Sequence, residues 1–308
     1  MTASSPPPRG VVAIFGPTAS GKTAVAEALS DRIPAELVSA DSMQLYRGVP
    51  ILTNQPSRPT RLVAVWPLAH EASVAEYQRL AHAAVDEALA RGRTPVVVGG
   101  TGLYLRAALS ALSLPPAPPP GARERLERLY DRLGAARTHG LLAERDPVAA
   151  ASVHANDRRR VVRALELHEA GGSLVPPDGS RLWAEDTRHP TTIFGLVVPR
   201  AILAARIAER ARAMFERGLE DEVRRALAEP LSRTARQIIG LRELAELPRD
   251  EAAATLELRT RRYAAYQRKW MRRIPGLIAL DGMRPPDDLA AEMVETARQG
   301  APSASVDS

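Results

Sequence analysis

The chain has 308 residues, 45% hydrophobic and 25% charged, which is typical of a soluble globular protein with one large domain or two smaller ones. It contains no cysteine, which excludes disulfides and thiolate zinc sites, and its six histidines show no metal-ligand spacing. The net charge of +6 favours a polyanionic partner such as nucleic acid, although arginine-rich codon usage would give the same balance.

The first residues, MTASSPPPRG, lack the apolar core of a signal peptide. No later apolar run approaches the length of a membrane span. We therefore expect a cytoplasmic, monomeric protein that has no membrane partner.

A phosphate-binding motif comes next. VVAIF, residues 11–15, predicts a short buried strand, and the residues after 22 carry apolar side chains at helical spacing as far as about residue 33. The intervening GPTASGKT matches the pattern GxxxxGK[ST] in its required context of strand, glycine-rich loop and helix. The residues expected to bind a diphosphate or nucleotide are Gly16, Pro17, Thr18, Ala19, Ser20, Gly21, Lys22 and Thr23.

The chemistry of a polyphosphate explains these residue types. Gly16 and Gly21 allow backbone conformations in which successive N–H groups point inward, and the helix N-terminus adds further donors. Lys22, one of only two lysines among 42 basic residues, brings a mobile charge, and Thr23 offers a hydroxyl to Mg²⁺. Kinases, NTPases and some transferases all use this loop, so the motif leaves the ligand open.

A second strand, residues 36–40, leads to Asp41. A carboxylate at the carboxyl end of a parallel strand faces the ligand crevice of an α/β sheet, so Asp41 is expected beside the phosphate loop. An equally good interpretation is a helix cap, since Asp-Ser is favourable capping chemistry. No other strand ends in an apolar run and an Asp that would clearly serve as a separate Walker B acid, which weakens an NTPase interpretation.

A helix is expected from about residue 74 to 91, then a continuous apolar strand, TPVVVGG, and a helix over residues 103–112. The turn Gly99-Gly100-Thr101-Gly102 joins this strand to its helix. It either lets a ligand approach the backbone or is simply a tight connection.

The proline-rich segment 113–121 predicts a domain boundary, because it is followed by residues with almost wholly helical patterns up to about 170. Strand character returns at residues 192–198. We therefore predict an α/β fold: a P-loop NTPase-like parallel sheet flanked by helices, with an inserted all-helical domain. The expected division is residues 1–114 and 191–300 for the core, with its C-terminal helices, and 115–190 for the insertion.

The remaining chain is largely helical. Residues 200–227 predict one long helix or two, on which Arg206 and Arg210 share a face. A last long helix, about 251–273, carries a basic stripe with an aromatic residue in it, while Tyr263 is expected to pack inward from another face. LIALD, residues 277–281, is the final predicted strand.

Several of these motifs together resemble the tRNA dimethylallyltransferases. They are GPTASGKT, SADSMQLYRG, VVVGGTGLYLRAAL, DPVAAASVHANDRRRVVRALE, RIAERARAMFERGLEDEV, RQIIGLRE and TRRYAAYQRKWMRR, in this order over about residues 11–280. The resemblance implies transfer of a dimethylallyl group from dimethylallyl diphosphate to N6 of adenosine 37, beside the anticodon of tRNA, with Mg²⁺ as the metal cofactor.

The resemblance also implies roles for individual residues. Asp41 would be the general base, Lys22 and the phosphate loop would hold the donor diphosphate, Thr23 would also serve Mg²⁺, and Arg210, rather than Arg206, would bind the leaving diphosphate. The tRNA would be contacted by Asp41, Ser42, Met43, Gln44, Thr101, Arg123, Arg159, Arg160, Arg163, Gln237, Gly240 and Arg242.

The chain departs from the family in places. VPILTNQP replaces a segment that usually carries a basic residue, and Ala265-Tyr266 replaces a usual Lys-Arg pair. Three alternatives remain open: an adenylate isopentenyltransferase acting on free AMP or ADP, a P-loop small-molecule kinase, and an RNA-binding protein with a relic loop. The long basic insertion argues against the first, and the intact Lys22, Thr23 and Asp41 argue against the last.

Overall fold

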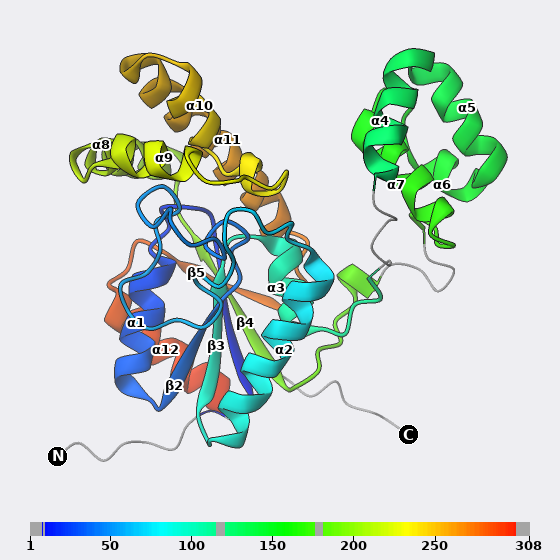
Figure 1. The fold of residues 1–308 in the computed structure, drawn as a ribbon. Coiled ribbons are helices and arrows are strands. Elements are labelled where there is room, and N and C mark those ends of the chain that lie inside the picture. The colour runs from blue at the N-terminus through cyan, green and yellow to red at the C-terminus, as the bar shows by residue number, and fades with distance from the viewer. Residues whose placement is uncertain (1–7, 9, 115–120, 176–180, 300–308) are drawn as a thin grey trace, which may run out of the picture. The chain divides into compact units, whose positions relative to one another are not determined.

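The computed structural model describes residues 8, 10–114, 121–175 and 181–299. Its centre is a five-stranded parallel sheet with the strand order β2-β3-β1-β4-β5 (Figure 1). The central strand, β1, is buried along its whole length, as expected for a parallel strand that is covered on both faces. The strands are β1 Val11–Phe15, β2 Ala35–Ser39, β3 Thr94–Gly99, β4 Thr191–Val197 and β5 Leu277–Asp281.

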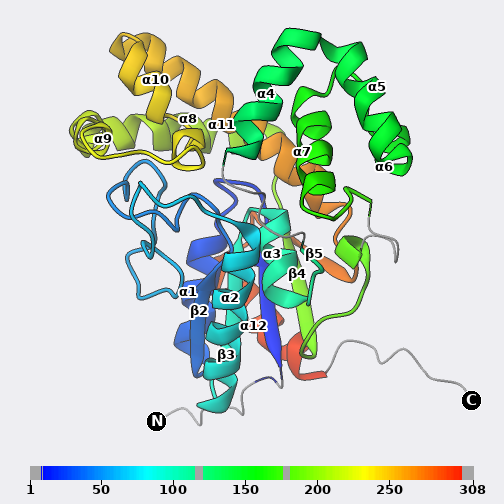
Figure 2. The same cartoon turned by 45° about the vertical axis from the view of Figure 1, so that its right-hand side comes forward.

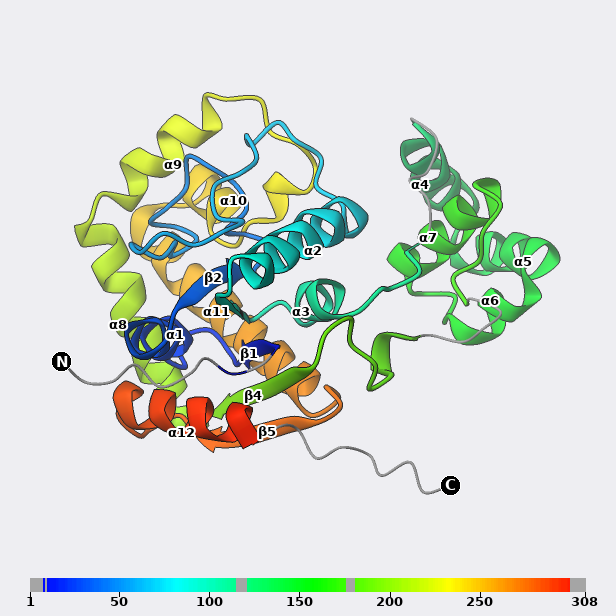
Figure 3. The ribbon, with the colours of Figure 1, turned by 90° about the horizontal axis from the view of Figure 1, so that it is seen from below.

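Helices cover both faces of the sheet. In the end-on view of Figure 3, α1 (Lys22–Arg32) and α12 (Pro286–Gln299) lie against one face, and α2 (Val74–Ala90) and α3 (Gly102–Leu109) against the other. The core under α1 and α12 is apolar and includes Ile14, Leu29, Phe194 and Met293. This packing fixes the start of α1, and with it the phosphate loop, at the carboxyl end of β1.

The C-terminal helices lie over the carboxyl ends of the strands, as Figures 1 and 2 show. They are α8 (Arg200–Glu216), α9 (Leu219–Leu227), α10 (Leu241–Glu246) and α11 (Arg249–Met271), with a short 3₁₀ turn, η2 (Ala235–Gln237), before α10. Because α8 packs along α11, two helices distant in sequence form one wall above the phosphate loop.

The chain divides into two compact units, one of residues 1–111 and 185–308 and the other of residues 112–184. The second unit has its own core, in which Leu126, Leu142 and Leu165 are fully buried. Its elements are α4 Ala122–Leu133, α5 Ala135–Arg145, α6 Pro147–Ser152, α7 Arg158–Glu169 and the 3₁₀ turn η1 Arg181–Trp183.

The two chain segments that flank this second unit are joined to each other within the first. The Ser110 hydroxyl donates to the Asp186 carbonyl at 2.8 Å, and the Arg188 amide donates to the Leu109 carbonyl at 2.8 Å. We call these two hydrogen bonds the neck. The neck holds the end of α3 close to the segment that leads into β4.

Most of the predicted elements are confirmed. β2 runs from Ala35 to Ser39 and β4 from Thr191 to Val197, each one residue earlier than predicted, and α3 ends at Leu109, three residues before its predicted end. Of the two possibilities for residues 200–227, the structure has two helices, with Gly218 at a φ of 88° between them. The helix α12 was not predicted. No helix in the described part of the chain is both long and apolar enough to span a membrane.

Candidate functional site

The phosphate loop has a backbone that only a few residue types can adopt. Gly21 has a φ of 91° and is the N-cap of α1, where no side chain caps the helix, and Ala19 has a φ of 64°. A Cβ on Gly16 would lie 2.8 Å from the Ser20 Oγ, so glycine is required for the close approach. The Ser20 hydroxyl is buried and has no hydrogen-bond partner within the described residues. The loop therefore offers uncapped backbone amides and an unsatisfied hydroxyl, which suit an oxyanion ligand.

The loop opens onto a cavity of about 700 Å³, which also receives Asp41 from the end of β2. The Met43 amide donates to the Asp41 Oδ1 at 3.0 Å, so a turn of the backbone orients the carboxylate. Lys22 lines the same cavity, and its Nζ donates to the Pro17 carbonyl at 2.7 Å. The expectation that Asp41 lies beside the phosphate loop is thus confirmed, and it is not a helix cap.

The cavity perturbs the titration of both charged groups. Burial raises the pKa of Asp41 above its ordinary value, an effect that the Met43 amide and the Lys22 ammonium partly oppose. Burial lowers the pKa of Lys22 to about 8, although the nearby Asp41 favours its charged form. The result is a carboxylate that accepts a proton more readily than usual, next to a lysine that is still mostly charged at neutral pH.

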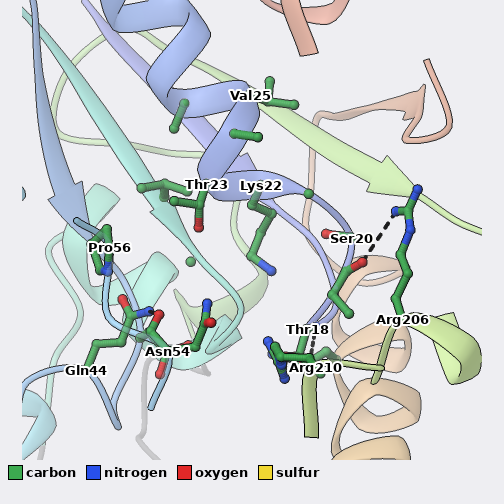
Figure 4. Close-up of a pocket in the computed structure, with 18 of the residues that line it drawn as sticks. Thr18, Ser20, Lys22, Thr23, Val25, Gln44, Asn54, Pro56, Arg206 and Arg210 are labelled. Atoms are coloured by element: carbon green, nitrogen blue, oxygen red, sulfur yellow. Dashed lines mark hydrogen bonds between the residues drawn. The ribbon is translucent and has the colours of Figure 1, made fainter. Parts of the chain in front are cut away.

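Two arginines of α8 reach the loop from the other side. The Arg210 Nη2 donates to the Thr18 Oγ1 at 2.6 Å, and the Arg206 Nη1 donates to the Ala19 carbonyl at 3.4 Å. In Figure 4, Lys22 points into the cavity from the start of α1, and both arginines approach from α8. The cavity therefore combines Lys22, Arg206 and Arg210 with the carboxylate of Asp41, and a fourth basic residue, Arg284, also lines it.

The wall opposite the arginines comes from the segment after β2. Figure 4 places Gln44 and Asn54 there. The amide of Gln44 is already engaged, since its Oε1 accepts from Ser39 and its Nε2 donates to the Asn54 carbonyl. A buried carboxylate, Glu222 of α9, accepts from the backbone amides of residues 51 and 52 at 2.8 Å each, which anchors this wall.

The glycine-rich turn after β3 is a tight connection. A Cβ on Gly99 would lie 2.2 Å from the Ala40 carbonyl oxygen, and a Cβ on Gly102 would lie 2.2 Å from the Trp270 ring. These glycines therefore make room for neighbouring protein atoms. Of the two interpretations left open by the sequence, the structure supports close packing.

Two residues of α11 belong to the site but were not assigned to it from the sequence. Tyr263, expected to pack inward, is half-buried and lines the cavity, and its hydroxyl lies 3.1 Å from the Thr101 Oγ1. The Ser42 amide donates to the same Thr101 oxygen at 3.2 Å. Gln267 lines the cavity one turn further on. Their spacing of four residues was the available signal, because it places them on one helix face.

The residues expected to contact tRNA lie in different environments. Ser42, Met43 and Gln44 lie at or beside the cavity, Gln237 and Arg242 are exposed, and Gly240 is buried. Gly240 has a φ of 99°, and a Cβ there would lie 2.6 Å from Leu52, so the position is restricted to glycine by packing.

In the helical unit, Arg159 and Arg160 are exposed at the start of α7. Arg123 and Arg163 instead pair with the buried carboxylate of Glu166, at 2.5 and 3.2 Å. Arg159 and Arg160 therefore have the more accessible charges of this set.

The described residues include no group of three or more His, Cys, Asp or Glu side chains that could hold a metal ion. Such a group is not required for Mg²⁺, which keeps several waters and commonly uses one or two protein oxygens together with substrate phosphates. Thr23 lines the cavity, and its hydroxyl is an oxygen of the kind that Mg²⁺ uses.

Known proteins resemble this chain over most of its length. The IPP transferase family model matches residues 44–274. A tRNA dimethylallyltransferase of Streptomyces coelicolor is 41% identical over 292 residues, which cover 91% of this chain and 92% of that protein.

Solved structures agree. A tRNA isopentenylpyrophosphate transferase from Bacillus halodurans is 32% identical, with a TM-score of 0.66 over 94% of this chain and 98% of that one. A eukaryotic dimethylallyltransferase acting on tRNA, at 24% identity, shares the fold with a TM-score of 0.72 over 88% of this chain and 73% of that one. By both sequence and structure, the chain belongs to the IPP transferase family.

Proposed function

We propose that this chain transfers the dimethylallyl group of dimethylallyl diphosphate to N6 of adenosine 37 in tRNA and releases diphosphate. Relatives that are about 40% identical over most of the chain are tRNA dimethylallyltransferases. The single observation that carries the proposal is that Asp41, Lys22 and the phosphate loop line one cavity. A group-transfer reaction of this kind needs a leaving-group site and a proton acceptor within reach of one another.

The phosphate loop and the arginines would serve the leaving group. As the bond between the allylic carbon and the diphosphate oxygen breaks, negative charge builds on the diphosphate. Lys22, Arg210 and the amides of the loop would stabilise that charge, and the hydrogen bonds of Lys22 to Pro17 and of Arg210 to Thr18 support this proposal because they hold both cations at the loop. Because an allylic carbon tolerates loosened bonding, this stabilisation should be the largest contribution to the rate.

Asp41 would accept the proton. The exocyclic amine of adenine is a weak nucleophile, since its lone pair is delocalised into the ring. As the new N6–carbon bond forms, the amine must lose a proton, and Asp41 is the carboxylate that lines the cavity beside the loop. Burial raises its pKa, which makes its carboxylate a stronger base than that of an exposed aspartate.

Mg²⁺ would be held by the Thr23 hydroxyl and by phosphate oxygens of the donor. When bound, it neutralises charge on the diphosphate. The loop amides would bind the diphosphate, and Asp41 would deprotonate N6 of the acceptor adenosine.

The tRNA would present its adenosine from the single-stranded anticodon loop, where a base is unstacked at little cost. Ser42, Met43 and Thr101 lie near the carboxylate and are proposed to contact the flipped base and its neighbours. Exposed arginines, Arg159 and Arg160 among them, are proposed to bind tRNA phosphates, so binding should weaken with salt. The helical unit is accordingly proposed as the tRNA-binding domain of a monomeric, cytoplasmic enzyme.

The proposed function is tested with Mg²⁺, labelled dimethylallyl diphosphate and either an anticodon stem-loop containing A36-A37-A38 or free AMP. We expect label in the stem-loop only, on N6 of A37. Label that enters only AMP would instead identify an adenylate isopentenyltransferase. Phosphoryl transfer from ATP to a small molecule, without prenyl transfer, would identify a kinase.

A further inference from the structure

Gln267 of α11 is buried at the centre of the site, with 2% of its surface exposed. Its side-chain amide makes two hydrogen bonds to backbone groups. The Thr18 N–H donates to its Oε1 at 2.7 Å, and its Nε2 donates to the Gly100 carbonyl at 2.9 Å. The amide thus joins the phosphate loop after β1 to the turn after β3, two strands that are neighbours in the sheet.

The contact with Thr18 fixes more than one atom. The N–H of Thr18 and the carbonyl of Pro17 belong to the same peptide unit, which is planar and trans, so the two groups point in opposite directions. Gln267 holds the N–H, and the Lys22 Nζ donates to the carbonyl at 2.7 Å. One rigid plane therefore lies between the glutamine and the lysine.

The surroundings are shaped to keep this amide in place. A Cβ on Gly100 would lie 2.1 Å from the Gln267 Nε2, so only glycine leaves room for the hydrogen bond. The Thr18 hydroxyl accepts from Arg210 at 2.6 Å, which holds the same residue from α8. Thr18 is thus held through its backbone by α11 and through its side chain by α8.

We propose that Gln267 is a positioning residue that orients the Pro17–Thr18 peptide, so that Lys22 is held where the diphosphate binds. This inference rests on the proposed function, because it takes the loop to be the diphosphate site. The Pro17 carbonyl also accepts from the Ser20 amide at 3.2 Å. Without the glutamine, the Thr18 end of the peptide plane loses its partner, so the plane can tilt and the carbonyl no longer fixes the ammonium of Lys22. Binding of the ligand must then also order Lys22, which lowers the affinity. Gln267 itself touches neither donor nor tRNA in this scheme.

The test measures the binding of inorganic diphosphate by calorimetry, together with the thermal midpoint. The variant is Gln267→Met, which keeps the length of the side chain and removes both hydrogen bonds. The matched control is Ser110→Ala, which removes a buried side-chain hydrogen bond to a distant carbonyl, at the neck and away from the cavity. We expect Gln267→Met to weaken diphosphate binding about tenfold, the equivalent of about 1.4 kcal/mol. Ser110→Ala should lower the thermal midpoint but leave the affinity unchanged.

A second variant, Gly100→Ala, displaces the glutamine amide, which its Cβ would meet at 2.1 Å, and this Cβ would also lie 3.1 Å from the Gly16 carbonyl oxygen. It should weaken diphosphate binding at least as much. It also supplies the test if Gln267→Met does not fold. An affinity within twofold of the wild type in the folded variants, or an equal loss in Ser110→Ala, would overturn the inference but not the proposed function. If the wild-type protein does not bind inorganic diphosphate at all, the proposed function itself fails, and the inference fails with it.

Discussion

The substitution Asp41→Asn separates the chemical role of this residue from its structural one. Asp41 Oδ1 accepts a hydrogen bond from the Met43 amide at 3.0 Å. An asparagine of the same shape can accept this bond through its own oxygen, so the turn after β2 should persist. What disappears is the negative charge and the ability to take a proton from the incoming amine.

The size of the loss follows from that role. A positioned general base contributes about 10²–10⁴-fold to a rate, so the rate constant of prenyl transfer should fall by that factor. Binding should respond differently, because Asp41 is a negative charge beside Lys22 in the cavity that we assign to diphosphate. Removing it should leave the affinity for diphosphate unchanged or increase it.

A single-turnover assay measures this, with enzyme in excess over a labelled anticodon stem-loop and with saturating donor. The matched control is Asp281→Asn, since Asp281 stands at the carboxyl end of β5 and accepts from the amide two residues on, at 3.0 Å, but is exposed. The control should react at the wild-type rate. A rate constant for Asp41→Asn within threefold of the wild type would refute Asp41 as the base, as would a loss that is fully explained by weaker diphosphate binding.

Three further predictions concern the cations. Arg210→Ala should lower kcat/KM for the donor about 100-fold, because it removes a charge from the leaving group, whereas Arg212→Ala, exposed on the same helix, should not. The pKa of Lys22 is about 8, so diphosphate affinity measured by titration should fall as the pH rises through 8, and Lys22→Arg should abolish that decline. In steady-state kinetics, Arg160→Ala should raise the tRNA KM more than it lowers kcat. The control Arg32→Ala, an exposed arginine at the end of α1 opposite the phosphate loop, should change neither constant. An unchanged KM for Arg160→Ala would contradict a tRNA-binding role.

The strands and the phosphate loop were predictable because their signals are local. β1, β3 and the loop each follow from a short run of sequence with a fixed chemistry. Asp41 was predictable only as one of two equal alternatives, since a strand-end aspartate also caps helices. The family resemblance and the parallel sheet together resolved that choice.

Other parts of the site depend on contacts that sequence patterns do not encode. The helical spacing of α11 predicts a basic face and a face that packs inward. It does not predict that Tyr263 and Gln267 line a cavity. Glu222 is one of three acidic residues in the first turn of α9, and nothing in the sequence distinguishes it from the other two. Only the fold brings it to the amides of residues 51 and 52. α12 was not predicted, although its buried residues Leu289, Met293 and Ala297 recur at a helical spacing of four.

The neck explains how a bulky module can interrupt the core without disturbing it. Leu109 and Arg188 are joined by a backbone hydrogen bond, and Ser110 and Asp186 by a second contact, although 76 positions separate the latter pair in sequence. Because its two ends are held together, the inserted unit of residues 112–184 constrains the sheet no more than a short loop would. A change in the length or sequence of the module should therefore leave the register of the sheet intact, so the unit that we propose to bind tRNA can vary separately from the unit to which we assign the chemistry.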